Sequence, residues 1–385
     1  MDRDRPAPPY DEQAAYDLGA QDLDAPRRRS WIWVPSLILL VLAAGWCAFW
    51  FYAAEQAKQL MAGWIERERL SGRIYSCGDQ SFSGFPFRME FRCSKAGAEL
   101  PKSNPPMSFA AAGVTAAMQV YQPTLLLAEV EGPLAIAETG QAAKLTANWE
   151  LAQISLRGTP RAPQRISFAT KDLVIDQSDG TQSDSIFMAE EAELHGRLAS
   201  GTVTDNPVID VATSLKGATA PNLHPLLKQP VAFKADAQLV GLRDFAPKTW
   251  TERFREIQKA HGRIDIRKAR FKQGDLHAEA SGVLTLTPSG HLDGDLQVIA
   301  AGIEKVLPAL GIEALKQGGG TRRERWGAAL SFLDKMAPGA IASAVSLLGE
   351  PAEINGRKGT KMLLRFKDGV ATLGPLKLGQ TPPLF

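Results

Sequence analysis

The 385-residue chain has few of the residues from which catalytic and metal sites are built. It contains three cysteines and five histidines. None of the histidines stands in an HExxH or HxH pattern; they are His195, His224, His261, His277 and His291. Phosphate-cradling glycine loops and nucleophile elbows are also missing. The sequence therefore predicts a protein that is not an enzyme, with no catalytic residue, no metal site and no cofactor.

The chain also lacks an excess of charge of either sign. Its 44 Lys and Arg residues nearly balance its 42 Asp and Glu residues, and the formal net charge is +2. A dedicated nucleic-acid binder has a strong basic excess on one face, so no nucleic-acid partner is expected. Once the N-terminal tail and the apolar run are set aside, about 330 residues remain, which suffices for one large or two ordinary domains.

A long apolar run occurs near the N-terminus, at Trp31–Ala53, with no charged residue until Glu55. A helix rises about 1.5 Å per residue, so such a run can cross a hydrocarbon core of about 30 Å. Tryptophans stand at its start, and aromatic residues stand again at its end (Trp50, Phe51 and Tyr52), as interfacial belts require. We therefore predict a transmembrane helix over residues 31–54 that attaches the protein to a membrane.

Charges on either side of this run predict its orientation. Arg27, Arg28 and Arg29 precede it, and the next positive charge is Lys58. The positive-inside rule then puts the N-terminus in the cytoplasm and the bulk of the chain on the far side of the membrane, as a single-pass protein. A cleaved signal peptide is the alternative. Its apolar core would be shorter, although cleavage after the small residues at 53–54 stays open.

The rest of the chain divides into a tail, a short helix and a β-rich body. Residues 1–30 are polar and proline-rich, which predicts a disordered cytoplasmic tail, and residues 55–71 predict a membrane-proximal helix. From residue 72 to 385, short runs with period two alternate with turn residues. In the segment 87–92, Phe87, Met89 and Phe91 alternate with charged residues.

Close spacing of these runs predicts antiparallel hairpins, because parallel pairs need long crossovers. Turns are expected at Gly132-Pro133 and Asp368-Gly369, among other places. The predicted fold class is mainly β (a β-rich α+β fold), with large antiparallel curved sheets behind one transmembrane helix. Packing helices are expected near residues 245–261 and 302–348.

Cys77 and Cys93 are the two cysteines beyond the apolar run. In an oxidising compartment we expect them to form a disulfide that closes a loop of roughly 15 residues, worth about 3 kcal/mol in the chain-entropy model. A free redox pair is the alternative, although no neighbouring residue lowers a thiol pKa in an obvious way. Cys47 is expected to be a small apolar residue within the membrane.

Several segments together resemble one bacterial family. They are the Cys77–Cys93 segment with its Gly84-Phe85-Pro86-Phe87-Arg88 core, the repeats at 280–286 and 290–296, and the ending at 368–379 followed by Pro382-Pro383-Leu384. These segments are similar to the envelope proteins catalogued as domain of unknown function 2125. The resemblance implies that the anchor lies in the bacterial inner membrane and that the bulk of the chain is in the periplasm. That family has no established activity, so the resemblance implies no catalytic residue. The strand-and-turn texture is also similar to that of AsmA-like and TamB-like proteins, which are membrane-anchored, β-rich and implicated in moving phospholipid or assembling the envelope.

The function expected from these observations is a non-catalytic role in envelope maintenance, in which an apolar sheet groove holds or passes lipid. Burying a lipid chain gains about 0.8 kcal/mol per CH₂ group, so such binding needs no specific motif. A scaffold that binds other envelope proteins through sheet edges or the helical insert is the alternative. An enzyme with an unrecognised site is a third hypothesis.

A reporter fusion tests the predicted orientation. We expect a reporter that is active only outside the cytosol to give full signal when fused after Phe385, because the arginines at 27–29 hold the N-terminus inside. The same reporter fused within residues 1–30 is the control and should be silent. Signal from the second fusion and silence from the first would overturn the orientation.

Overall fold

The computed structural model describes residues 33–159, 162–223, 225–246, 248–302, 349–374 and 376–385. The chain divides into two compact units, with the boundary between Gln56 and Ala57. The predicted tail at 1–30 lies outside the described residues. So does the predicted helical segment near 302–348, apart from Gly302.

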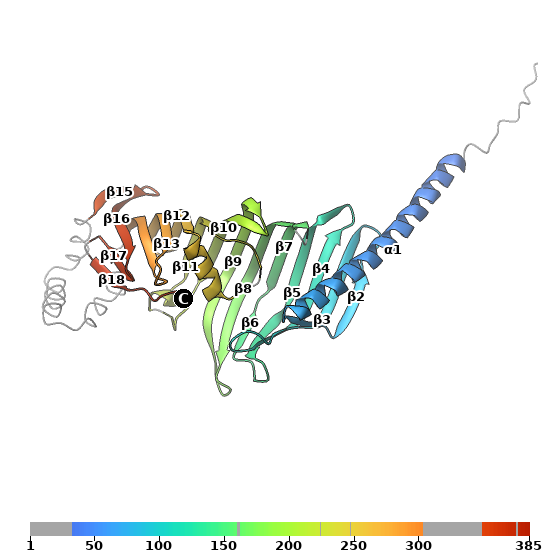
Figure 1. Ribbon diagram of the computed structural model, residues 1–385, viewed down its shortest axis with the longest axis horizontal. Helices are drawn as coiled ribbons and strands as arrows, with labels where there is room; N and C mark the ends of the chain where they lie inside the picture. The colour runs from blue at the N-terminus through green and yellow to red at the C-terminus, as the bar shows by residue number, and fades with distance from the viewer. Residues whose placement is uncertain (1–32, 160–161, 224, 247, 303–348, 375) are drawn as a thin grey trace, which may run out of the picture. The chain divides into compact units, whose positions relative to one another are not determined.

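A single helix, α1 (Trp33–Leu70), joins the two segments that the sequence predicts at 31–54 and 55–71 (Figure 1). It is long and apolar enough to cross a membrane, and a signal sequence near an N-terminus has the same character. Gly72 ends it with φ +86°, donating its N–H to Arg69 O at 3.0 Å while Arg73 N–H reaches Glu68 O at 2.9 Å. This pair of bonds is a Schellman motif, which favours glycine because of the left-handed backbone.

Every described strand belongs to one antiparallel sheet, which confirms the mainly β fold class. Strands follow one another in chain order as hairpins (Figure 1). Their bounds are β1 (Ile74–Ser76), β2 (Asp79–Ser83), β3 (Arg88–Leu100), β4 (Met107–Gln119), β5 (Gln122–Glu138), β6 (Leu145–Asn148), β7 (Leu151–Thr159), β8 (Ala162–Ser178), β9 (Ser183–Thr202), β10 (Asp205–Ala218), β11 (Val231–Val240), β12 (Arg263–Gln273), β13 (Leu276–Leu286), β14 (Leu292–Ala301), β15 (Glu350–Ile354), β16 (Arg357–Lys367), β17 (Val370–Leu373) and β18 (Leu376–Gln380).

Three positions in the sheet hold two short strands end to end. β1 and β2 both pair with β3, β6 and β7 both pair with β5 and β8, and β15 and β17 both pair with β16. In the gap between β6 and β7, the Trp149 indole N–H donates to Val130 O at 2.8 Å. The indole thus satisfies a carbonyl at a point where the neighbouring strand is interrupted.

The predicted turn at Gly132-Pro133 is wrong, because β5 continues through it. Leu134 pairs with Ala111 and Glu131 pairs with Gly113, so the two residues of the expected turn lie opposite Ala112. This is a β-bulge, in which an extra residue is absorbed without ending the strand. Proline is tolerated at such a position because the ladder is already interrupted.

Helix α2 (Trp250–Lys259) is shorter than the predicted 245–261 segment. It begins after Thr249, whose side chain accepts from Glu252 N while the Glu252 side chain accepts from Thr249 N. Such a capping box satisfies two backbone donors at a helix start and stops the helix from extending backwards. α2 contacts β13, and its Ile257 is only 4% exposed whereas Trp250 is 78% exposed.

Cys77 lies in the gap between β1 and β2, and it is bonded to Cys93 in β3. Cys93 is buried, and the bond ties the interrupted edge of the sheet to its first full-length strand.

Thiol labelling tests this bond. Denatured but unreduced protein should take up one equivalent of maleimide, at Cys47, because the other two thiols are joined. After reduction it should take up three. Three equivalents without reduction would show that the disulfide does not form in the cell.

Candidate functional site on the sheet

One face of the sheet is apolar over most of its width. Directly paired residues on neighbouring antiparallel strands point to the same face. The register therefore defines a row of side chains that crosses the sheet from β2 to β16, and we call its face the apolar face. Its members, in order, are Phe82, Phe91, Ala116, Ala128, Ile154, Phe168, Leu194, Thr213, Ala235, Ala269, Ala280, Val298 and Met362.

The row one residue away points to the opposite face, the polar face. Its members, in order, are Ser81, Arg92, Thr115, Glu129, Gln153, Ala169, Glu193, Ser214, Lys234, Arg270, Glu279, Ile299 and Lys361. The two rows differ by a single residue in register, yet one is nearly free of polar groups and the other is mainly polar. A one-residue slip of any strand would exchange them, so this contrast specifies the register.

Irregular residues keep the apolar side chains on one face where simple alternation would move them. Lys95 lies within β3 with φ 49°. On one side of it, Phe82 packs against Phe91 with the two rings tilted, and the Lys58 ammonium of α1 lies 5.5 Å from the centroid of the Phe82 ring. On the other side Tyr75, the partner of Ala98, stacks on Trp64 of α1 at 5.0 Å. In a regular strand, residues an odd number of positions apart point to opposite faces. Positions 91 and 98 nevertheless face the same helix, so the left-handed backbone at Lys95 reverses the alternation between them.

The same device recurs in β8, β10 and β12. Asp172 (φ 50°) and Gly217 (φ 61°) adopt left-handed backbone within their strands, and β12 has a register shift between Ile266 and Ala269. After each of these points the residues on the apolar face change from even-numbered to odd-numbered positions, or the reverse. Leu173, Leu215 and Ala218 consequently join one buried cluster with Ala192. Bulges of this kind also increase strand twist.

Ion pairs between register partners cover the polar face. Asp210 accepts from Arg197 at 2.6 Å and from Arg267 at 2.9 Å, and the Arg197 hydrogen bond is the main cause that lowers the Asp210 pKa. Arg365 likewise bonds Asp295 at 2.8 Å. Exposed pairs contribute little to stability, each about 0–1 kcal/mol. They do penalise a shifted register, because like charges would then lie opposite one another.

A part of the apolar face on β8 and β9 is open to solvent. Ile166 is 52% exposed, Phe168 38% and Leu194 49%, and Phe168 pairs directly with Leu194. Between Ile166 and Ile209 lies Gly196, where an added Cβ would meet only their methyl groups, at 3.9 and 4.0 Å. We call Ile166, Phe168 and Leu194 the apolar window. Three large side chains at this exposure on one face are unusual for a protein core.

The surroundings of the window are covered. Farther along the same strands Ala189, Ala192, Ala218 and Val231 form a buried cluster, against which Leu227 of η3 (Pro225–Lys228) packs. Farther across the sheet Leu284 and Leu296 are 8% and 7% exposed. The window is therefore an exposed part of the apolar face that has buried clusters along its strands and farther across the sheet.

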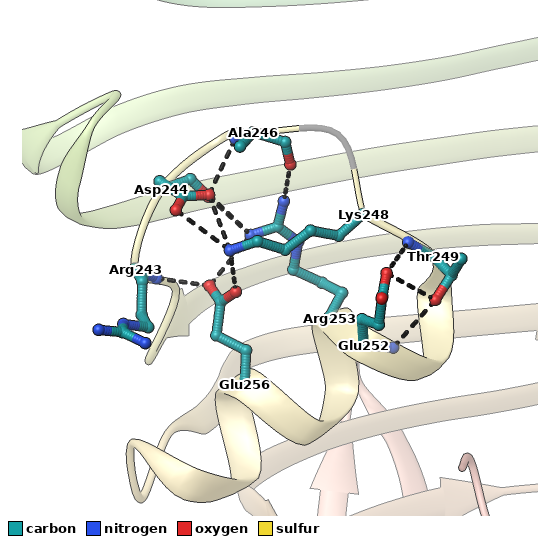
Figure 2. A network of polar contacts seen from close by, with 8 residues as sticks. All are labelled: Arg243, Asp244, Ala246, Lys248, Thr249, Glu252, Arg253 and Glu256. Atoms are coloured by element: carbon teal, nitrogen blue, oxygen red, sulfur yellow. Dashed lines mark hydrogen bonds and ion pairs between the residues drawn. The ribbon is translucent and has the colours of Figure 1, made fainter. Parts of the chain in front are cut away.

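A cluster of charged residues lies at the start of α2 and is the other candidate site in the described residues (Figure 2). The Glu256 carboxylate accepts from Arg243 N at 2.6 Å, from Arg253 at 3.0 Å and from Lys248. Lys248 also bonds Asp244 at 2.9 Å. Glu256 is only 9% exposed.

Electrostatics in this cluster indicate a structural role. Burial raises the pKa of Glu256, but the Arg243 N–H, Lys248 and Arg253 together outweigh burial and the net pKa lies below its ordinary value. The hydrogen bond from Lys248 lowers the pKa of Asp244, and Glu256 and then Asp244 raise the pKa of Lys248, so both groups are held in their charged forms. A catalytic acid or base needs a pKa near the working pH, whereas these groups are held as ions. The cluster clamps Asp244 and Lys248 onto α2.

Two shallow hollows lie on the sheet. One of about 310 Å³ is lined by residues of the polar face, among them Thr115, Leu127, Gln153 and Ser167, together with Ala128 and Ile154 of the apolar row. The other, of about 120 Å³, is lined by Lys268 and Glu279 among others. Neither hollow includes the residues of the apolar window.

The described histidines are dispersed over β9, the end of α2, β13 and the turn before β14. In the described part of the chain, no three His, Cys, Asp or Glu side chains are grouped so as to hold a metal ion. Sequence reasoning singled out Cys77 and Cys93, which lie at the edge of the sheet, and missed Ile166, Phe168 and Leu194. The alternation around 166–168 is visible in the sequence, but their exposure is not.

Glu256→Gln tests the clamp. We expect the amides of α2 to exchange about tenfold faster at neutral pH, since weakening a buried charged hydrogen-bond partner costs about 1–3 kcal/mol. Because the folded pKa of Glu256 is lowered, its contribution is present above the unfolded pKa and is lost as pH falls through the folded one. The difference between variant and wild type should thus shrink in acid. Glu353→Gln, at an exposed position, is the control, and equal exchange in all three proteins would contradict the clamp.

Comparison with known proteins identifies a family but no individual relative. No curated protein matches the chain. A family model matches residues 50–382, which include the end of α1, the described sheet and α2, and its description is "Uncharacterized protein conserved in bacteria (DUF2125)". This is the family that the segments around Cys77–Cys93 and at the C-terminus resemble. Since the match covers well over half of the chain, the protein belongs to this bacterial family, domain of unknown function 2125.

Proposed function

We propose that this protein is a membrane-anchored, non-catalytic component of the bacterial cell envelope that holds the hydrocarbon part of a lipid against the apolar face of its sheet. In this proposal α1 is retained as an inner-membrane anchor and the sheet lies in the periplasm. The observation that supports the proposal best is the apolar window of Ile166, Phe168 and Leu194, which is exposed although the apolar cluster beside it on the same strands is buried.

Energetics favour hydrocarbon at the window. Water in contact with apolar side chains costs about 25 cal/mol per Å², and covering eight methylenes would recover roughly 6 kcal/mol before the cost of association. The register partners across β4, β5 and β7 are Ala116, Ala128 and Ile154, so the apolar row continues beyond the window. A linear chain could therefore lie along the row from strand to strand.

The polar face explains why only one side would bind lipid. Its rows of ion pairs and amides would have to lose water against hydrocarbon, which costs several kcal/mol for each unpaired group. The resemblance in strand-and-turn texture to AsmA-like and TamB-like proteins supports the same class of ligand. A protein-binding scaffold at the inner membrane is the alternative, and an exposed apolar patch would serve it as well.

Native mass spectrometry of the full-length protein tests the proposal. Wild type should release bound phospholipid, and a Phe168→Lys, Leu194→Lys double variant should lose it. A lysine in hydrocarbon costs about 2.5–3.5 kcal/mol, so the affinity should fall at least about a hundredfold.

Leu127→Lys is the matched control. Leu127 is 53% exposed, as apolar as the window residues, but it lies on the polar face. This variant should keep its lipid, and any lipid bound around α1 should be the same in all three proteins. Equal lipid content in the double variant and wild type would contradict the proposal, and a co-purified protein in place of lipid would favour the scaffold.

A further inference from the structure

Exposed aromatic side chains gather at two neighbouring hairpin tips. Phe85 and Phe87 lie in the turn between β2 and β3, with exposures of 49% and 62%, and Tyr121 lies in the turn between β4 and β5, with an exposure of 67%. Val120 N donates to Phe87 O at 3.0 Å, so the two turns are bonded to one another. We call Phe85, Phe87 and Tyr121 the aromatic tip.

Followed toward its N-terminus, α1 runs toward the end of the strands at which this tip lies. Within residues 57–385, Trp64 stacks on Tyr75 of β1, and Lys58, nearer the N-terminus, lies over Phe82 of β2. From Trp64 to Lys58 the helix thus runs along the sheet edge toward the β2–β3 turn. Phe85 follows Phe82 by three residues, or at most about 11 Å of extended chain.

The apolar run is close by in the chain. Its last residue, Ala53, precedes Lys58 by five residues, which span at most about 18 Å even when fully extended. If the run crosses a membrane, chain connectivity alone therefore keeps Lys58 within that reach of the membrane surface. The opposite ends of β3 and β4, at the 101–106 turn, lie some thirteen residues of strand away.

The chemistry of the tip suits a lipid interface. Phenylalanine and tyrosine combine an apolar ring with, in tyrosine, a hydroxyl that stays hydrated, and such residues concentrate at the boundary between hydrocarbon and headgroups. Pro86 has no backbone N–H to desolvate. Arg88 follows directly, with a side chain that is 63% exposed and paired with Glu90 at 2.9 Å, and it places a cation beside the tip that anionic headgroups would attract.

We propose that the aromatic tip inserts into the interfacial layer of the membrane that α1 crosses and holds this end of the sheet on the lipid surface. The inference rests on the proposed anchoring by α1. It adds a second contact with the bilayer, formed by the folded sheet itself, at the edge where the apolar row begins with Phe82 and Phe91.

Site-directed spin labelling of the full-length protein tests this contact. In a Cys47→Ala background, with Cys77 and Cys93 left paired, single labels are placed at Phe87→Cys and at Tyr121→Cys. The protein is reconstituted into vesicles of phosphatidylethanolamine with a minority of phosphatidylglycerol. Relaxation by a water-soluble nickel chelate should be several-fold weaker at these two positions than at the control, while relaxation by oxygen should be stronger.

Leu223→Cys is the matched control, because Leu223 is an 80% exposed apolar residue in the turn that follows β10, at the opposite ends of the strands. Leu42→Cys, within the apolar run, reports whether α1 is in the bilayer. If the Leu42 label is relaxed mainly by oxygen and the tip labels mainly by the nickel chelate, the tip contact is wrong and the anchor stands. If the nickel chelate also relaxes the Leu42 label strongly, both the anchor and the tip contact are wrong. Tip labels shielded from both reagents indicate a protein contact and overturn the proposal as well.

Discussion

The strict separation of apolar and polar side chains between the two faces of one sheet is the constraint on which the rest of the structure depends. A row from Phe82 to Met362 crosses thirteen strands with Thr213 as its one polar member, and the adjacent row is mainly charged or polar. A sandwich hides such an apolar face against a second sheet. All described strands here belong to one sheet, so among the described residues no second sheet covers this face.

Irregular backbone maintains this separation. Long strands accumulate twist, and a strict alternation over 13–20 residues would have to match that twist without error. Lys95, Asp172 and Gly217 interrupt the alternation with left-handed backbone, and after each interruption the apolar residues resume on the same face. These residues are therefore part of the mechanism by which one face stays apolar. A polar residue in a left-handed conformation costs about 1 kcal/mol or more, and packing of the following apolar residues offsets this cost.

Much of the fold could be predicted from the sequence, because hairpin turns and period-two patterns are local. The strand around Phe91, the turn at Asp368-Gly369 and the family resemblance all followed from short segments. The continuation of β5 through Gly132-Pro133 could not be predicted, since the bulge depends on which residue lies opposite. The apolar row could not be predicted either. Alanines such as Ala116, Ala128 and Ala235 give a weak signal one by one, and only the register assembles them into a surface. Exposure of Phe168 and Leu194 depends on what η3 and α2 leave uncovered.

The central claim is that hydrocarbon touches one face of this sheet and water touches the other. Two adjacent residues of β8 test it most directly, because Phe168 points to the apolar face and Ser167 to the polar face. A benzophenone amino acid placed at either position and irradiated in intact cells inserts into C–H bonds within its reach. The account predicts a lipid adduct at position 168 and none at 167. Equal adducts at both positions, or lipid at 167 alone, would contradict it.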